Sequence, residues 1–148
     1  MPHPLAFTKS ALGMDGNVAA LLGYIFWPIA LVNLIAEKDN QFVRFHAVQK
    51  LFFILFNIII FFVLFFAFFI LSFVIMLIAG VAASTAGDVG GAIGMIISFI
   101  AMLIWIVLPL IFALIILLGL ILCAVKAYQG EPFKLPIIGR FASKVAPL

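Results

Sequence analysis

Three long apolar runs, separated by short polar segments, organise this chain. The runs cover residues 18–36, 51–80 and 92–125, and the second is interrupted only by Asn57 and Ser72. An α-helix rises about 1.5 Å per residue, so the first run just reaches across a hydrocarbon core of about 30 Å, and the second spans roughly 45 Å. The pattern therefore predicts three transmembrane helices.

Polarity rises sharply between the first and second runs. Glu37, Lys38 and Asp39 come together there, and Asn40 follows with a side chain suited to cap the amino end of a helix. We expect an amphipathic interfacial helix over residues 40–50. It should continue without a break into the second run as one tilted helix.

Prolines leave open the paths of the first and third runs. Pro28 lies in mid-run, so the first segment either crosses with a kink or enters and leaves on the same side. We favour the crossing, because membrane helices tolerate a single proline. Pro109 divides the third run into halves too short to span, which favours one kinked helix. Residues 81–91, rich in small residues and carrying Asp88, should form the loop between the last two runs.

Composition indicates that lipid, not water, surrounds most of the chain. Of its 148 residues, 68% are hydrophobic and 9% are charged, whereas a soluble domain carries about 25% charged residues. The expected fold class is therefore all-α, an integral membrane helical bundle of about three transmembrane helices plus the interfacial segment. It divides into an N-terminal tail (1–16), one membrane domain (17–128) and a basic tail (129–148).

Lysines and arginines indicate the orientation. One cluster precedes the second run and another follows the third, so two crossings place both clusters on the same side, and short cation-rich segments stay in the cytoplasm. We predict the inner (cytoplasmic) membrane, a cytoplasmic C-terminus and, if the first run crosses, an external N-terminus. The cations expected at lipid headgroups are Lys38, Arg44, Lys126 and Arg140.

A polar stripe marks the start of the second long helix. His46, Gln49, Lys50 and Asn57 fall along one helical face, and polar groups at membrane depth are the first candidates for function. The stripe is either a polar, proton-accessible groove with His46 at its mouth or an interfacial face held by headgroups and interhelical hydrogen bonds. We favour the second interpretation, because such bonds at helix ends are common.

Little in the sequence suits catalysis. It shows no nucleophile with its base, no phosphate loop and no metal-ligand cluster, and Cys123, the single cysteine, excludes internal disulfides. A haem or pigment on His46 is a remote alternative, because His3 is the only other histidine. We expect a non-enzymatic protein without cofactor or metal, and its net charge of +3 lies at run ends, unlike the basic face of a nucleic-acid binder.

Small residues recur at four-residue spacing where the third run begins. Such rows let helix backbones approach closely, and we expect them to serve packing inside the protein, with a homo-oligomer as the alternative. The residues concerned are Gly87, Gly90, Gly91, Gly94 and Ser98.

Two stretches carry a resemblance to a known family. They are Phe42-Val43-Arg44-Phe45-His46-Ala47-Val48-Gln49 and Ala127-Tyr128-Gln129-Gly130, the latter followed by Leu135-Pro136-Ile137-Ile138-Gly139. Together they resemble an uncharacterised family of small prokaryotic membrane proteins that is similar to the channel component of the chloroplast inner-envelope protein-import translocon. The resemblance implies a compact helical bundle and an accessory role in protein transport or complex assembly.

These observations favour an accessory or assembly subunit of a larger membrane complex. Its expected partners are membrane lipids and other membrane protein subunits. The alternative is a transport element in which copies or partners line a path faced by His46, Gln49 and Asn57, because three helices alone cannot enclose a channel.

Overall fold

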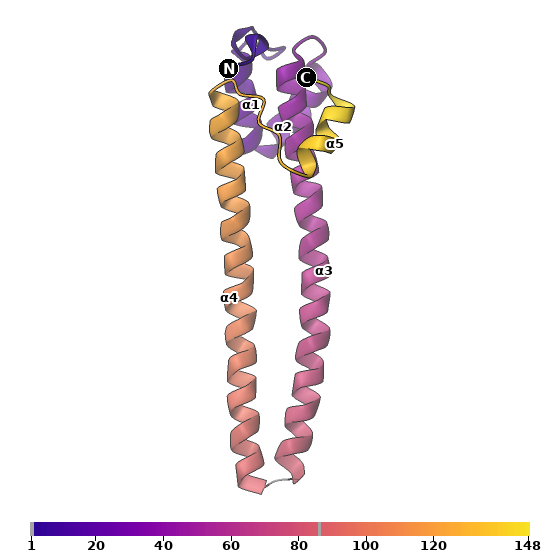
Figure 1. Ribbon diagram of the computed structural model, residues 1–148, viewed down its shortest axis with the longest axis vertical. Coiled ribbons are helices and arrows are strands. Elements are labelled where there is room, and N and C mark those ends of the chain that lie inside the picture. Colours follow the sequence, from indigo (N-terminus) through magenta and orange to yellow (C-terminus); the bar gives the residue numbers. More distant parts are fainter. Residues whose placement is uncertain (1, 86) are drawn as a thin grey trace. The chain divides into compact units, whose positions relative to one another are not determined.

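The computed structural model describes residues 2–85 and 87–148, and the elements it assigns there are all helices. This confirms the all-α class. Along the chain they are the 3-10 helix η1 (Pro4–Phe7) and the α-helices α1 (Gly16–Ile25), α2 (Trp27–Ala36), α3 (Gln41–Thr85), α4 (Gly87–Tyr128) and α5 (Ile138–Val145) (Figure 1). Internal contacts divide the chain into two compact units. Unit 1 comprises Met1–Ile58 with Leu117–Leu148, and unit 2 comprises Ile59–Ile116.

Two of these helices are long and apolar enough to cross a membrane. They are α3, with 45 residues, and α4, with 42. As predicted, α3 joins the amphipathic segment to the second apolar run without a break, and the Asn40 side chain caps its start by accepting a hydrogen bond from the backbone N–H of Val43 at 3.3 Å. Helix α4 continues through Pro109, as the single-helix interpretation predicted.

The first apolar run, for which the sequence left a kinked crossing and a re-entrant path open, is not one helix. It forms two ten-residue helices, α1 and α2, which break at Phe26 in an extended conformation. Pro28 explains the break, because it has no N–H with which to continue the α1 hydrogen bonds to the Tyr24 carbonyl. Each helix is about 15 Å long, half of a hydrocarbon core. The Asn33 amide joins the pair by donating to the Ala19 carbonyl at 2.8 Å.

The prediction of a loop over residues 81–91 is wrong, because α3 extends to Thr85 and α4 begins at Gly87. The hydroxyls of Ser84 and Thr85 each donate to the Val81 carbonyl at 2.9 Å, so they are satisfied inside the helix instead of ending it. Gly87 adopts a φ of 58°, which glycine tolerates without steric cost. Small residues that favour turns in water are thus helical here.

The core of unit 1 draws on both ends of the sequence. Ala6, Tyr24, Phe42, Cys123 and Ala127 are buried together. The backbone N–H of His3 donates to the Gly130 carbonyl at 2.7 Å, and the Asn17 amide donates to the Tyr128 carbonyl at 2.9 Å. The residues expected to form a separate N-terminal tail therefore pack against the end of α4.

Unit 2 pairs the second part of α3 with the first part of α4. Trp105 of α4 donates its indole N–H to the Ser72 hydroxyl of α3 at 2.6 Å. A side chain added at Gly94 would meet the Ala79 carbonyl oxygen at 3.4 Å, so the two backbones approach closely at that point.

Candidate functional site

A buried polar cluster in unit 1 gathers three of the four residues of the predicted stripe. His46, Gln49 and Lys50 project from α3, and Tyr24 from α1 meets all three. The Gln49 amide donates to the Tyr24 hydroxyl at 2.9 Å, and that hydroxyl lies 3.2 Å from Nδ1 of His46. Because the hydroxyl accepts from Gln49, its own proton is free to bridge to His46.

Gln49 also binds the segment that follows α4. Its Nε2 donates to the Phe133 carbonyl at 3.1 Å, while its Oε1 accepts from the Leu135 N–H at 3.4 Å. The same Nε2 lies 3.9 Å from the Cys123 sulfur. One fully buried side chain therefore links α1, α3, α4 and the C-terminal segment, which makes it the centre of the cluster.

Lys50 compensates for the proline break in the first apolar run. Its Nζ donates to the Tyr24 carbonyl at 3.0 Å, the backbone acceptor that Pro28 cannot serve. This carbonyl lies in the last turn of α1, where the helix dipole favours a cation. A lysine on α3 therefore fixes the end of α1 and the turn between α1 and α2, which together form a helical hairpin.

His46 is enclosed by rings and does not stand at a groove mouth. It is 1% exposed, and its ring centroid lies 4.5 Å from that of Phe42, 5.2 Å from that of Phe45 and 5.8 Å from that of Tyr24. Its Nε2 has no hydrogen-bond partner among the described residues. A haem or chlorophyll needs an open approach to a ring nitrogen, so these surroundings do not fit the pigment alternative.

Asn57, the fourth residue of the stripe, does not join the cluster. Its amide donates to the carbonyl of Phe53, one turn earlier on α3, at 2.7 Å. A shared helical face did not predict a shared partner, because the Asn57 amide bonds back to its own helix, whereas Gln49 reaches Tyr24 of α1 and the segment after α4.

Several buried polar residues outside the predicted stripe fasten the N-terminal segment. Glu37 accepts from the Ala11 N–H at 2.7 Å and from the Asn40 N–H at 3.2 Å. The Asn40 amide in turn donates to the Leu5 carbonyl at 2.8 Å. The signal available in the sequence was that Glu37 and Asn40 fall beside apolar runs, where a polar side chain needs a partner.

The four cations expected at lipid headgroups have different surroundings. Lys38 and Arg140 are exposed, whereas Arg44 is half-buried and its Nε has no partner among the described residues. Lys126 donates to the Glu131 carboxylate at 2.8 Å, and this hydrogen bond lowers the pKa of Glu131. Their role at headgroups stays a prediction.

The small-residue row divides in a similar way. Gly90 and Gly94 are buried and Gly94 approaches Ala79, whereas a Cβ added at Gly91 would meet nothing within 4 Å. Ser98 donates to the Gly94 carbonyl of its own helix at 2.8 Å. Packing inside unit 2 therefore involves one row of the predicted set.

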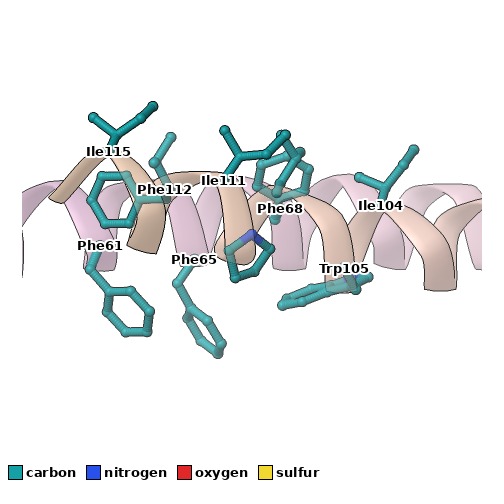
Figure 2. Close-up of a pocket in the computed structure, with 11 residues that line it drawn as sticks. Phe61, Phe65, Phe68, Ile104, Trp105, Ile111, Phe112 and Ile115 are labelled. Carbon is teal, nitrogen blue, oxygen red and sulfur yellow. The ribbon is translucent and has the colours of Figure 1, made fainter. Parts of the chain in front are cut away.

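Unit 2 contains an apolar groove of about 310 Å³ between α3 and α4. Figure 2 shows Phe65 and Trp105 extending to the same side of the two helices, and their ring centroids are 5.9 Å apart. Pro109 also lines the groove. The lining residues are Phe61, Leu64, Phe65 and Phe68 of α3 with Ile104, Trp105, Leu108, Pro109, Ile111, Phe112 and Ile115 of α4.

Comparisons with known proteins place the chain among membrane proteins. A family model described as "Magnetosome magnetite crystal formation protein family" matches residues 10–142. A UPF0132 membrane protein of Methanocaldococcus jannaschii is 31% identical over 137 residues, which cover 92% of this chain and 93% of that protein. A second UPF0132 membrane protein of that archaeon is 45% identical over 40 residues, which cover 26% of this chain and 29% of that protein. No solved structure matches the chain significantly.

These findings confirm the coarser part of the family prediction. The chain resembles small membrane proteins of prokaryotes over nearly its whole length. The comparisons show no link to the chloroplast import translocon.

Proposed function

Because the chain belongs to the magnetosome magnetite crystal formation protein family, we propose that it is a non-enzymatic membrane protein that assembles with other membrane subunits. The family description ties its members to magnetite crystals in magnetosomes. The residues of this chain support one step of such a role, which is association with partner helices inside the membrane.

The groove of unit 2 is the observation that carries this proposal. Helices associate in lipid by close van der Waals packing, because lipid tails are as apolar as the side chains. The Trp105 side chain is held by Ser72 at 2.6 Å, so one wall of the groove is fixed in place. A fixed apolar groove of about 310 Å³ gives a ridge of side chains from a partner helix more contacts than mobile acyl chains can keep.

Orientation follows from the distribution of charge. Asp88 is the single charged residue between residues 51 and 125, so every lysine and arginine belongs to the sequence of unit 1. Segments rich in these residues stay in the cytoplasm. We therefore propose the inner (cytoplasmic) membrane, with both ends of the chain on its cytoplasmic side and α3 and α4 as the crossings.

Filling the groove tests the assembly role. Leu108 lines the groove, and Ile106 is exposed on α4 outside it, so Leu108→Trp and Ile106→Trp form a matched pair. After gentle detergent extraction, native gels should show the wild type and Ile106→Trp in an assembly larger than the 16.2 kDa chain. Leu108→Trp should release the single chain.

A second measurement identifies the contact directly. A photo-crosslinking amino acid at position 108 should join the chain to a membrane protein partner, and one at position 106 should do so much less. The proposal is wrong if the wild-type chain migrates alone in every mild detergent. It is also wrong if purified protein conducts in planar bilayers and His46→Ala changes that conductance, because that result supports the transport alternative.

A further inference from the structure

Unit 1 leaves the tip of the α1–α2 hairpin uncovered. Ile25, Phe26 and Trp27 form this tip and are 66%, 58% and 56% exposed. The opposite end of the hairpin is polar, because α1 begins after Asp15 and α2 ends before Lys38. The hairpin is therefore apolar at its tip and charged about 15 Å away, at the other end of both helices.

A second uncovered apolar edge lies on α5. Phe141 and Val145 of α5 and Ile137, the residue just before it, are spaced four residues apart, and each is more than half exposed. Arg140 and Lys144 are also exposed, and Nζ of Lys144 lies 5.7 Å from the Phe141 ring centroid. A helix with an apolar stripe beside cations is the type that lies in a membrane interface.

Both edges lie beside the same turn of α3. Lys50 holds the Tyr24 carbonyl, next to the hairpin tip, at 3.0 Å. The ring centroid of Phe52 lies 6.5 Å from that of Phe141 on α5. Lys50 is also the last charged residue of α3, because the next charge in the sequence is Asp88. The two edges therefore meet α3 at the point where its charged residues end and its charge-free apolar run begins.

We propose that unit 1 is seated in the membrane–water interface by these two edges, with its hairpin tip and the α5 stripe inserted among the upper acyl chains of one leaflet. The first apolar run then enters and leaves the same leaflet and does not cross. Arg140 and Lys144 bind the phosphates of anionic lipids, while Lys38, at the far end of the hairpin, stays in water. Tryptophan at the tip suits this depth, because its ring is amphipathic.

The depth of Trp27 tests the hairpin. The chain has two tryptophans, so Trp105→Phe leaves Trp27 as the only tryptophan, whose emission is excited selectively, and Trp27→Phe leaves Trp105 as the control. In vesicles, a quencher attached near the headgroup should quench Trp27 several-fold more than one deep in the acyl chains. Trp105 should show the reverse order. Stronger deep quenching of Trp27, or none by either probe, overturns the proposal.

Side-specific labelling gives an independent test of the path. In a Cys123→Ala background, Lys9→Cys and Lys144→Cys should react with a membrane-impermeant maleimide from the same side of sealed vesicles. Reaction from opposite sides means that the first run crosses, and the proposal fails.

The cations on α5 are tested by lipid binding. Native mass spectrometry of protein from phosphatidylglycerol-containing vesicles should show fewer bound phosphatidylglycerol molecules for the pair Arg140→Gln and Lys144→Gln. Lys38→Gln serves as the control and should leave that number unchanged. An equal loss from Lys38→Gln, or none from the pair, contradicts the assignment of α5 to the headgroups.

Discussion

Replacing Gln49 with leucine isolates the contribution of the side chain at the centre of the polar cluster. Leucine keeps roughly the same volume, so the substitution removes hydrogen bonds without opening a large cavity. It leaves the Phe133 carbonyl and the Leu135 N–H without the partners that Gln49 supplies at 3.1 and 3.4 Å. The Tyr24 hydroxyl keeps its contact with His46.

The magnitude follows from the burial of these two backbone groups. A buried polar group without a partner costs about 1–3 kcal/mol. Phe133 and Leu135 are half-buried, which places each group at the lower end of that range. We expect Gln49→Leu to lower the free energy of opening the C-terminal segment by about 2–3 kcal/mol, equivalent to a roughly 30- to 150-fold larger open population.

Hydrogen exchange followed by mass spectrometry measures that population in α5. Its backbone amides should exchange faster by the same factor when opening and closing are rapid. Asn57→Leu is the control, because the 2.7 Å hydrogen bond of the Asn57 amide stays within α3, and it should change exchange by less than about twofold. Equal exchange in the two variants would refute the central role of Gln49.

Three further predictions concern other contacts. Lys50→Met leaves a carbonyl of α1 without a donor and should destabilise the hairpin by about 1–3 kcal/mol, measured by exchange of α1 and α2 amides. Gly94→Leu should destabilise the protein by about 1–3 kcal/mol in mixed-micelle unfolding. Gly91→Leu should change little, because a Cβ added at Gly91 has nothing within 4 Å. The hydrogen bond from Lys126 lowers the pKa of Glu131. The stability that this bond contributes is therefore present above the ordinary glutamate pKa and is lost as the pH falls through the lowered pKa of Glu131. Lys126→Gln should raise the titration midpoint of the Glu131 carboxyl group, measured by NMR.

Hydropathy and capping residues predicted the long helices well. A run of apolar residues longer than a membrane is thick has few alternatives to a helix, because lipid offers no partner for backbone groups. Asn40 marked the start of α3 correctly, and Pro109 left α4 whole. These features depend on residues that are close together in the sequence, so the local sequence pattern predicts them.

The pattern of apolar and polar residues could not predict contacts between residues that are far apart in the sequence. Periodicity placed Gln49 and Asn57 on one face of a helix, but only the fold brings the Leu135 N–H to Gln49 across 86 positions of sequence. Pro28 was compatible with both a kinked crossing and a re-entrant path, and the structure has a break in the helix there. The break is stabilised by Lys50, whose contact with Tyr24 no local rule could supply.

The low charge of unit 2 bears on how the protein enters the bilayer during synthesis. In the two-crossing topology, the connection between α3 and α4 has to pass through the membrane, and Asp88 is the single ionised side chain that passes with it. An aspartate at mid-membrane costs about 2.5–3.5 kcal/mol, which about ten leucine, isoleucine, phenylalanine or valine residues offset. The two helices contain many more such residues, so their insertion as a pair is energetically downhill without transfer of any folded domain.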